Sequence, residues 1–261
     1  MLLEKYPDVH VILGSRNEGR GNDAVKDITS SLGTDKCHGR LEVLQMDTSS
    51  DESVRTAADR ITGTLYGIVN NAGVHSDSDI KLTVGTNYLG PKRVSEALLD
   101  KLERPGGRIV NISSASAPMF VQSCTNQDLV AKLSEPWTIS GGIQELDEIS
   151  TSHHDENVIG SNNAYGYSKA LLSAYTWLFA RDHPDLIVNA ITPGFINTDM
   201  TSGWGATNSP EKGAIPPVWL LMSDELTKVP TGRYYGSDCK RSPWNVYRGP
   251  GDPVYEGPDG K

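Results

Sequence analysis

The chain has 261 residues, of which 37% are hydrophobic, so it is long enough for one large domain with a substantial core. Its formal net charge of -9 argues against nucleic acid and anionic membranes as partners, because both select clustered Lys and Arg. No apolar stretch has the length of a membrane span or of a signal sequence. We therefore expect a soluble, cytoplasmic protein.

Cysteine and histidine give no metal-site signal. Cys37, Cys124 and Cys239 lie far apart and form no CxxC pair, which is typical of free thiols in a reducing cytosol. His153 and His154 lie beside two acidic residues, but adjacent histidines point in different directions. We interpret them as part of a solvated polar loop and predict no metal.

Short apolar strands alternate with helical segments in the first part of the chain. The stretch 2–8 has the pattern of the last turns of a helix. The predicted strands are His10–Ser15, Leu41–Asp47, Leu65–Gly73 and Gly106–Ser114, and the predicted helices are Asn22–Leu32, Ser53–Ile61 and Leu82–Leu102, the last interrupted at Gly90 and Pro91. Nearly continuous apolar runs in the strands favour a parallel sheet covered on both faces.

A polar segment of about fifty residues separates Ser114 from Tyr165, and loops of this length are uncommon and often functional. We predict an insertion over about 118–161. The elements expected from here on are short helices at Asn126–Leu133 and Ile143–Ile149, a helix at Ala164–Arg181, a strand at Leu186–Ile191, a helix at Pro210–Met222 and an edge strand in GRYYG, 232–236. The prediction is one doubly wound α/β domain over 1–236 and a mostly irregular tail over 237–261.

Polar residues follow several of the predicted strands directly. They are Asp47 with Thr48, Asn70 to Gly73, Ser113 with Ser114, and Pro193 with Gly194. Ligands of open parallel sheets bind at the carboxyl ends of the strands. Each group alone is also typical of a helix cap or a turn. Their recurrence at successive strand ends favours a binding site there.

The motif YGYSK places Tyr165 and Lys169 four residues apart on one helix face. An ammonium beside a phenol favours the ionised form, so this spacing predicts a tyrosine pKa below its usual value of about 10. The same spacing occurs at Tyr88 and Lys92 in YLGPK. There Pro91 disfavours a regular helical turn, and we expect no chemistry from that pair.

The motifs NNAG, TNYLG, GRIVNISS, AYGYSK and PGFINTDM, in this order, resemble the short-chain dehydrogenase/reductase family. The similarity runs from about His10 to Leu221 and is greatest to its monomeric carbonyl reductases. The resemblance implies a Rossmann-like fold and NADPH-dependent reduction of an aldehyde, ketone or quinone. It also implies a monomer, because the long insertion in those reductases covers the helices through which other members oligomerise.

The resemblance implies a role for each residue of the catalytic set. Tyr165 would give a proton to the carbonyl and Ser114 would hydrogen-bond the substrate oxygen. Lys169 would lower the pKa of Tyr165 and bind the nicotinamide ribose. Asn87 would fix a water that connects Lys169 to solvent.

Cofactor type is predicted at the end of the His10–Ser15 strand. An acidic residue here would pair with the ribose of NAD, whereas an arginine accommodates the phosphate of NADP. Ser15 is followed by Arg16, so we predict NADP. The further cofactor contacts implied by the resemblance are Asp47 and Thr48 to adenine, Asn70 and Gly73 to the adjoining ribose and backbone, Tyr165 and Lys169, and the segment with Pro193, Gly194, Ile196 and Thr198 at the nicotinamide carboxamide.

The glycine-rich loop of the family, TGxxxGxG, has no counterpart in this sequence. EGRG, 18–21, lacks its spacing and is interpreted as a surface loop leading into a helix. In the strand order 3-2-1-4-5-6 the first strand is central, so we expect an N-terminally incomplete sheet with a gap between the strands near His10 and Leu65. Backbone donors for the cofactor's pyrophosphate would also be missing, so we expect weak or no NADPH binding.

Two explanations of the missing loop remain open. About twenty-five residues could belong upstream in an active reductase, as a strand, loop and helix require. Alternatively, the chain is a non-catalytic binding protein that cannot hold dinucleotide. The intact catalytic set favours the first. A third hypothesis is an alcohol dehydrogenase of the same family.

Substrate contacts are expected from the insertion and from 195–209. The apolar candidates there are Met119, Phe120, Trp137, Met200 and Trp204. They suggest an apolar carbonyl compound, although core packing accounts for each equally well.

Overall fold

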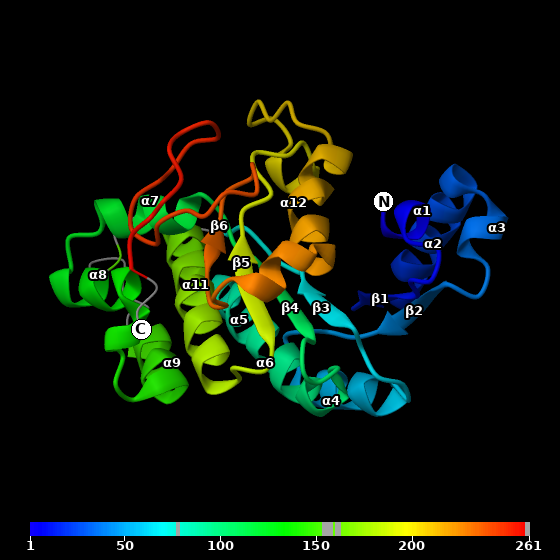
Figure 1. Ribbon diagram of the computed structural model, residues 1–261, viewed down its shortest axis with the longest axis horizontal. Coiled ribbons are helices and arrows are strands. Elements are labelled where there is room, and N and C mark those ends of the chain that lie inside the picture. Colours follow the sequence, from blue (N-terminus) through cyan, green and yellow to red (C-terminus); the bar gives the residue numbers. More distant parts are fainter. Residues whose placement is uncertain (77–78, 153–158, 160–162, 259–261) are drawn as a thin grey trace.

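The computed structural model describes residues 1–76, 79–152, 159 and 163–258. Its main sheet has the order β3-β4-β5-β6 with all neighbours parallel, and a second sheet pairs β1 with β2, also parallel (Figure 1). The strands are β1 (Val11–Ser15), β2 (Leu41–Gln45), β3 (Gly67–Asn70), β4 (Arg108–Ile112), β5 (Ile187–Ile191) and β6 (Tyr234–Tyr235). The predicted α/β fold with parallel strands is confirmed.

Strand β4 lies in the interior of the main sheet and is buried along its whole length. Successive side chains of a strand point to opposite faces. Ile109 belongs to the core beneath α11 (Ala164–Asp182), and Val110 belongs to the core beneath α12 (Pro210–Met222). Helices thus cover both faces of this sheet, which is why its strands are apolar throughout.

The α11 face also carries α4 (Asp51–Arg60), α5 (Ile80–Asn87) and α6 (Leu89–Ala97), followed by η1 (Leu99–Lys101). The predicted long helix is interrupted at Tyr88, just before Gly90 and Pro91. Pro91 therefore lies in the first turn of α6, where a missing backbone N–H leaves no helical hydrogen bond unmade.

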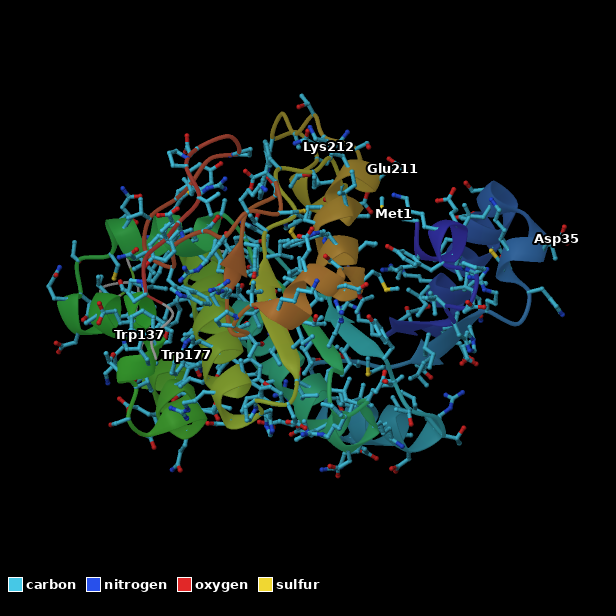
Figure 2. All side chains as sticks on the ribbon, viewed as in Figure 1. Met1, Asp35, Trp137, Trp177, Glu211 and Lys212 are labelled. Atoms are coloured by element: carbon cyan, nitrogen blue, oxygen red, sulfur yellow. The ribbon has the colours of Figure 1, made fainter. Side chains whose placement is uncertain are left out.

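The elements between β4 and α11 are α7 (Ser116–Ser123), α8 (Gln127–Ser134), η2 (Pro136–Thr138) and α9 (Gly142–Ser152), and the insertion predicted over 118–161 begins within α7. The two short helices expected here are confirmed as α8 and α9, whereas α7 was not predicted. Figure 2 shows Trp137 of η2 beside Trp177 of α11, with ring centroids 6.1 Å apart. His153 and His154 lie outside the described residues. Among the residues that are described, no group of His, Cys, Asp and Glu could hold a metal ion.

After β5 the chain forms η3 (Asp199–Thr201), and η4 (Asp224–Lys228) follows α12. From 237 to 258 it has neither helix nor strand, apart from an isolated bridge between Arg241 and Tyr235. This tail is nevertheless attached to the sheet. The Ser242 amide donates to the Tyr234 carbonyl oxygen of β6 at 2.9 Å, and Trp244 is buried against the Tyr234 ring. In the described part of the chain, no helix is long and apolar enough to cross a membrane.

The first 45 residues form α1 (Leu2–Lys5), β1, α2 (Glu18–Leu32), α3 (Thr34–Cys37) and β2, which lie together at one side of the molecule (Figure 1, blue). The interpretation of 18–21 as a surface loop was wrong, because these residues form the first turn of α2. Asn17 caps that turn by accepting a hydrogen bond from the Arg20 amide at 2.9 Å, and Glu18 favours it through the helix dipole.

The expected gap between β1 and β3 is present, since the two strands belong to different sheets. The strands on both sides of this gap are poorly buried. No residue of β1 is fully buried, and Val69 of β3 is 38% exposed although it lies in a parallel sheet. Helix α2 buries only Gly21. The segment 1–45 therefore has far less core contact than the main sheet.

Arg40 is the main polar connection within this segment. Its guanidinium donates to the carbonyl oxygens of Leu3, Tyr6, Val9 and Lys36 at 2.6–3.2 Å, linking α1, α3 and the turn before β1. Hydrogen bonds from a charged group are stronger than neutral ones. Arg40 thus compensates partly for the small apolar core.

We predict that Arg40→Ala lowers the free energy of local opening of 1–45 by about 1–3 kcal/mol, because four carbonyl groups lose a charged donor. Hydrogen exchange followed by mass spectrometry should show faster exchange in β1 and β2 and unchanged exchange in β4. Arg55→Ala, an exposed arginine of α4, is the control. Equal protection of β1 in both variants would contradict the role of Arg40.

Candidate active site

The polar groups predicted at the strand ends lie at one edge of the main sheet. In the parallel register Asn70 is opposite Asn111, and Ile112 is opposite Ile191, so β3, β4 and β5 end together. Ser113 and Ser114 follow β4 directly, and α11 begins at Ala164 above the same edge. The sheet therefore collects side chains that are distant in sequence.

Tyr165 lies in the first turn of α11 and forms a hydrogen bond with the hydroxyl of Ser114. The neighbouring Gly166 permits this approach, because a Cβ there would lie 2.9 Å from the Ser116 carbonyl oxygen in α7. Ser114 is itself held from two sides. Its Oγ accepts from the Ser116 amide at 3.1 Å, and its carbonyl oxygen accepts from the Tyr234 hydroxyl at 3.0 Å. The serine and tyrosine hydroxyls thus lie together at this edge of the sheet.

Lys169 is 4% exposed, and its Nζ donates to the Ile112 carbonyl oxygen at 2.8 Å. Its Nζ is 5.8 Å from the centroid of the Tyr165 ring. Burial lowers the pKa of Lys169 to about 8, because the ammonium loses its hydration. The lysine therefore titrates much closer to neutral pH than an exposed lysine does.

The structure differs from the predicted effect of Lys169 on the tyrosine. Burial raises the pKa of Tyr165, and the hydrogen bond with Ser114 only partly opposes this rise. The ammonium points to the Ile112 carbonyl rather than to the phenol oxygen. The phenol is consequently protonated at neutral pH.

Asn87, at the end of α5, fixes the loop that follows β3. Its Oδ1 accepts from the Val74 amide at 2.8 Å, and its Nδ2 donates to the Val74 carbonyl at 2.9 Å and to Ser168 at 3.0 Å. At Gly73 a Cβ would lie 3.2 Å from Asn87 Oδ1 and 3.6 Å from Lys169 Nζ. Asn87, Gly73 and Lys169 are thus neighbours. The water expected at Asn87 stays a prediction.

Asn70 and Ser113 are directed into the core. Asn70 Nδ2 donates to Ser95 at 3.0 Å and to Asn111 Oδ1 at 2.8 Å, and Asn111 donates on to Thr176 of α11. Ser113 bonds to the Lys169 carbonyl and to Ser173. The Asn70 amide is therefore engaged in a buried network, although the resemblance implied a contact with the cofactor's ribose.

Arg16, Asp47 and Thr48 lie at the carboxyl end of the small sheet. Arg16 is exposed just beyond β1. Hydrogen bonds from the hydroxyl and the amide of Ser49 lower the pKa of Asp47, and the charge of Arg16 lowers it further. Thr48 packs against Gly90, where a Cβ would lie 3.1 Å from its Oγ1. A cation and a carboxylate are thus presented beside each other to solvent.

The segment after β5 begins at the same carboxyl edge of the main sheet. Gly194 has a φ of 92°, which glycine adopts without strain, and a Cβ there would lie 3.2 Å from Ser237. Its amide donates to Thr192 across Pro193. Ile196 packs on Gly213 of α12, and Thr198 forms a reciprocal cap with Thr201.

Two further aromatic contacts complete the site. The His75 ring lies 4.7 Å from that of Tyr165 and equally far from that of Trp204. Trp204 was among the predicted apolar candidates, but His75 was missed. Its position two residues after NNAG, at a strand end, is the signal that could have identified it.

The second Tyr–Lys pair is structural. Tyr88 is fully buried and donates to Asp147 of α9 at 2.6 Å, and Lys92 pairs with the same carboxylate at 3.2 Å. Both side chains thus connect α5 and α6 to the insertion. The expectation that YLGPK is not a catalytic motif agrees with this placement.

Known proteins are similar to this chain in both sequence and fold. The sequence model described as short chain dehydrogenase matches residues 6–125. Carbonyl reductase (NADPH) 1 of Mus musculus is 30% identical over 256 residues, covering 90% of this chain and 88% of that protein. The chain belongs to the short-chain dehydrogenase/reductase family.

Plant members of the short-chain dehydrogenase/reductase family are similar to the same extent. (+)-Neomenthol dehydrogenase of Arabidopsis thaliana is 29% identical over 266 residues, which cover 87% of each protein. The structure of menthone neomenthol reductase from Mentha piperita superposes with a TM-score of 0.73 at 25% identity, covering 90% of this chain and 92% of that one.

We predict that Lys169 makes the stability of this family member rise with pH. Between its folded pKa of about 8 and its ordinary 10.5, the unfolded chain binds more protons than the folded one, so the free energy of unfolding increases with pH in this window. Lys169→Met should remove the rise.

Chemical denaturation at several pH values measures this effect. Buried tyrosines with raised pKa values oppose it above about pH 10, so the relevant quantity is the difference between wild type and Lys169→Met at each pH. Lys81→Met, an exposed lysine of α5, is the control. A constant difference between wild type and Lys169→Met from pH 7 to 10 would contradict the prediction.

Proposed function

We propose that this chain reduces a small aldehyde, ketone or quinone to the alcohol with NADPH. The observation that supports the proposal most directly is the pair of hydroxyls of Ser114 and Tyr165 at the carboxyl edge of a parallel sheet, with Lys169 buried beside them. The name of the mouse relative, carbonyl reductase (NADPH) 1, points to the same reaction and cofactor.

Ser114 and Tyr165 offer two donors where negative charge develops on a carbonyl oxygen. NADPH, when bound, supplies the hydride that reaches the carbonyl carbon. The Ser114 hydroxyl then stabilises the oxygen, and the Tyr165 phenol delivers its proton. Lys169 provides a nearby charge that stabilises the phenolate left behind.

The raised pKa of Tyr165 matches the protonated donor that carbonyl reduction requires. A phenol that burial keeps protonated at neutral pH is ready to give a proton. The non-catalytic alternative has no comparable support, because every member of the predicted catalytic set is present at the edge of the sheet.

The residues present fit the two ends of NADPH. Exposed Arg16 matches a ribose phosphate, with Asp47 and Thr48 beside it for the adenine end. Gly73 leaves room beside Lys169 for the nicotinamide ribose, and Pro193, Gly194, Ile196 and Thr198 line the segment that would meet the carboxamide. The sequence offers no glycine-rich loop for the pyrophosphate, so we expect weak affinity.

We further propose that the protein is a cytoplasmic monomer. Helices α7, α8 and α9 pack on α11, most of whose residues are buried, so this helix offers little surface to a second subunit. The three cysteines are unpaired, as in a reducing compartment.

Tyr165→Phe should lower kcat for carbonyl reduction by about 10²–10⁴-fold, because the proton donor is lost. Ser114→Ala should lower it by about 10²–10³-fold through the loss of one donor to the oxygen. NADPH consumption with a panel of aldehydes and quinones measures both.

Tyr167→Phe is the matched control for the tyrosine. The Tyr167 hydroxyl donates to the Ile149 carbonyl at 2.9 Å in the core, so this variant should lose stability but keep kcat. A folded Tyr165→Phe protein with normal turnover would rule out Tyr165 as the proton donor.

Arg16→Ala should reduce the preference for NADPH over NADH by about 10–100-fold, because one charged contact to the phosphate disappears. The ratio of kcat/KM for the two cofactors measures it. Arg20→Ala, an exposed arginine of α2, should leave the ratio unchanged. An unchanged ratio in Arg16→Ala would refute the phosphate contact.

A further inference from the structure

The catalytic phenol is the first of three aromatic rings in contact. The His75 imidazole lies against the Tyr165 ring at 4.7 Å between centroids, with their planes tilted by 36°. The Trp204 indole meets the same imidazole edge-on, with 4.7 Å between the ring centroids and 74° between the planes. Separations in this range are favourable for aromatic pairs. A continuous aromatic surface therefore begins at the group proposed to deliver the proton.

Two separate parts of the chain bring these rings to Tyr165. His75 follows Val74, whose amide and carbonyl are both bonded by Asn87, so the loop that carries the imidazole is fixed. Trp204 lies after η3, between Gly203 and Gly205, whose φ values are 82° and 80°. One ring thus has a rigid support, whereas the other lies in a turn built by two glycines.

Core packing does not account for Trp204. Its side chain is 52% exposed, whereas Trp244, whose ring packs in the core, is 7% exposed. Met119 of α7, and Phe195 and Met200 after β5, are also large apolar residues with more than a third of their surface exposed. Apolar surface left open on several segments of a soluble protein commonly marks a binding site.

We propose that His75 and Trp204 select flat aromatic carbonyl substrates, by stacking on the substrate ring while its carbonyl oxygen meets Ser114 and Tyr165. This inference rests on the proposed function and assigns specificity within that site. A flat ring gains contact with the aromatic faces and edges of both residues, whereas a puckered saturated ring of the same size cannot stack. Neither residue has to take part in proton transfer.

Benzaldehyde and cyclohexanecarbaldehyde form a matched pair of substrates, because they share a carbon skeleton and differ in aromaticity. His75→Leu and Trp204→Leu should each raise KM for benzaldehyde by about tenfold, with kcat changed less than twofold. KM for cyclohexanecarbaldehyde should stay the same. Tyr66→Leu is the control, since Tyr66 is a 43% exposed aromatic residue at the opposite end of β3. Equal changes for both aldehydes in the His75 and Trp204 variants would overturn the proposal.

Binding to the protein without NADPH gives a second readout that needs no turnover. Menadione, a flat quinone that quenches tryptophan fluorescence, should bind wild type with an apparent affinity about tenfold higher than His75→Leu, and Trp204→Leu should lose most of the quenching. Unchanged titrations in both variants would overturn the aromatic contact. If wild type reduces neither aldehyde, the proposed function fails, and the menadione titration still decides the inference.

Discussion

The site depends on how α11 is held against the end of β4. Two hydrogen bonds join them at one residue: Lys169 Nζ donates to the Ile112 carbonyl, and the Ser113 hydroxyl donates to the Lys169 carbonyl. Burying an ammonium is unfavourable unless it is hydrogen-bonded, so this arrangement favours one register of the helix over the strand. That register brings Tyr165 to Ser114.

A buried polar network extends the same constraint across the sheet. Asn70, Asn111 and Thr176 form a chain of hydrogen bonds from β3 through β4 to α11. An unpaired amide in this interior would be strongly unfavourable, so the network fixes the relative positions of the three elements. Asn87 fixes the loop after β3 through its two hydrogen bonds to Val74, and thereby fixes the position of His75.

The segment 1–45 is stabilised by different interactions from the rest of the molecule. The main sheet buries its strands between helices, whereas β1 has one partner and no fully buried residue. Its order relies on Arg40 and on helix caps more than on a core. The adenine end of the proposed cofactor site thus lies on the least buried part of the molecule, and the nicotinamide end on the most buried part.

The sequence by itself determined the strands and most of the helices, but not α7 or the first turn of α2. Apolar runs identified the strands, because a strand is a local property of the sequence. The resemblance of its motifs to the short-chain dehydrogenase/reductase family identified Ser114, Tyr165 and Lys169 as candidates. Only the tertiary structure decided which side chains meet across distant segments and which are buried. It bonded Tyr88 to Asp147 in the core and brought Tyr165 to Ser114. Burial raised the pKa of the Tyr165 phenol, whereas the sequence had predicted a lowered one. It directed Asn70 inward, and it joined His75 to Trp204 across distant segments, because desolvation and side-chain contact depend on the whole fold.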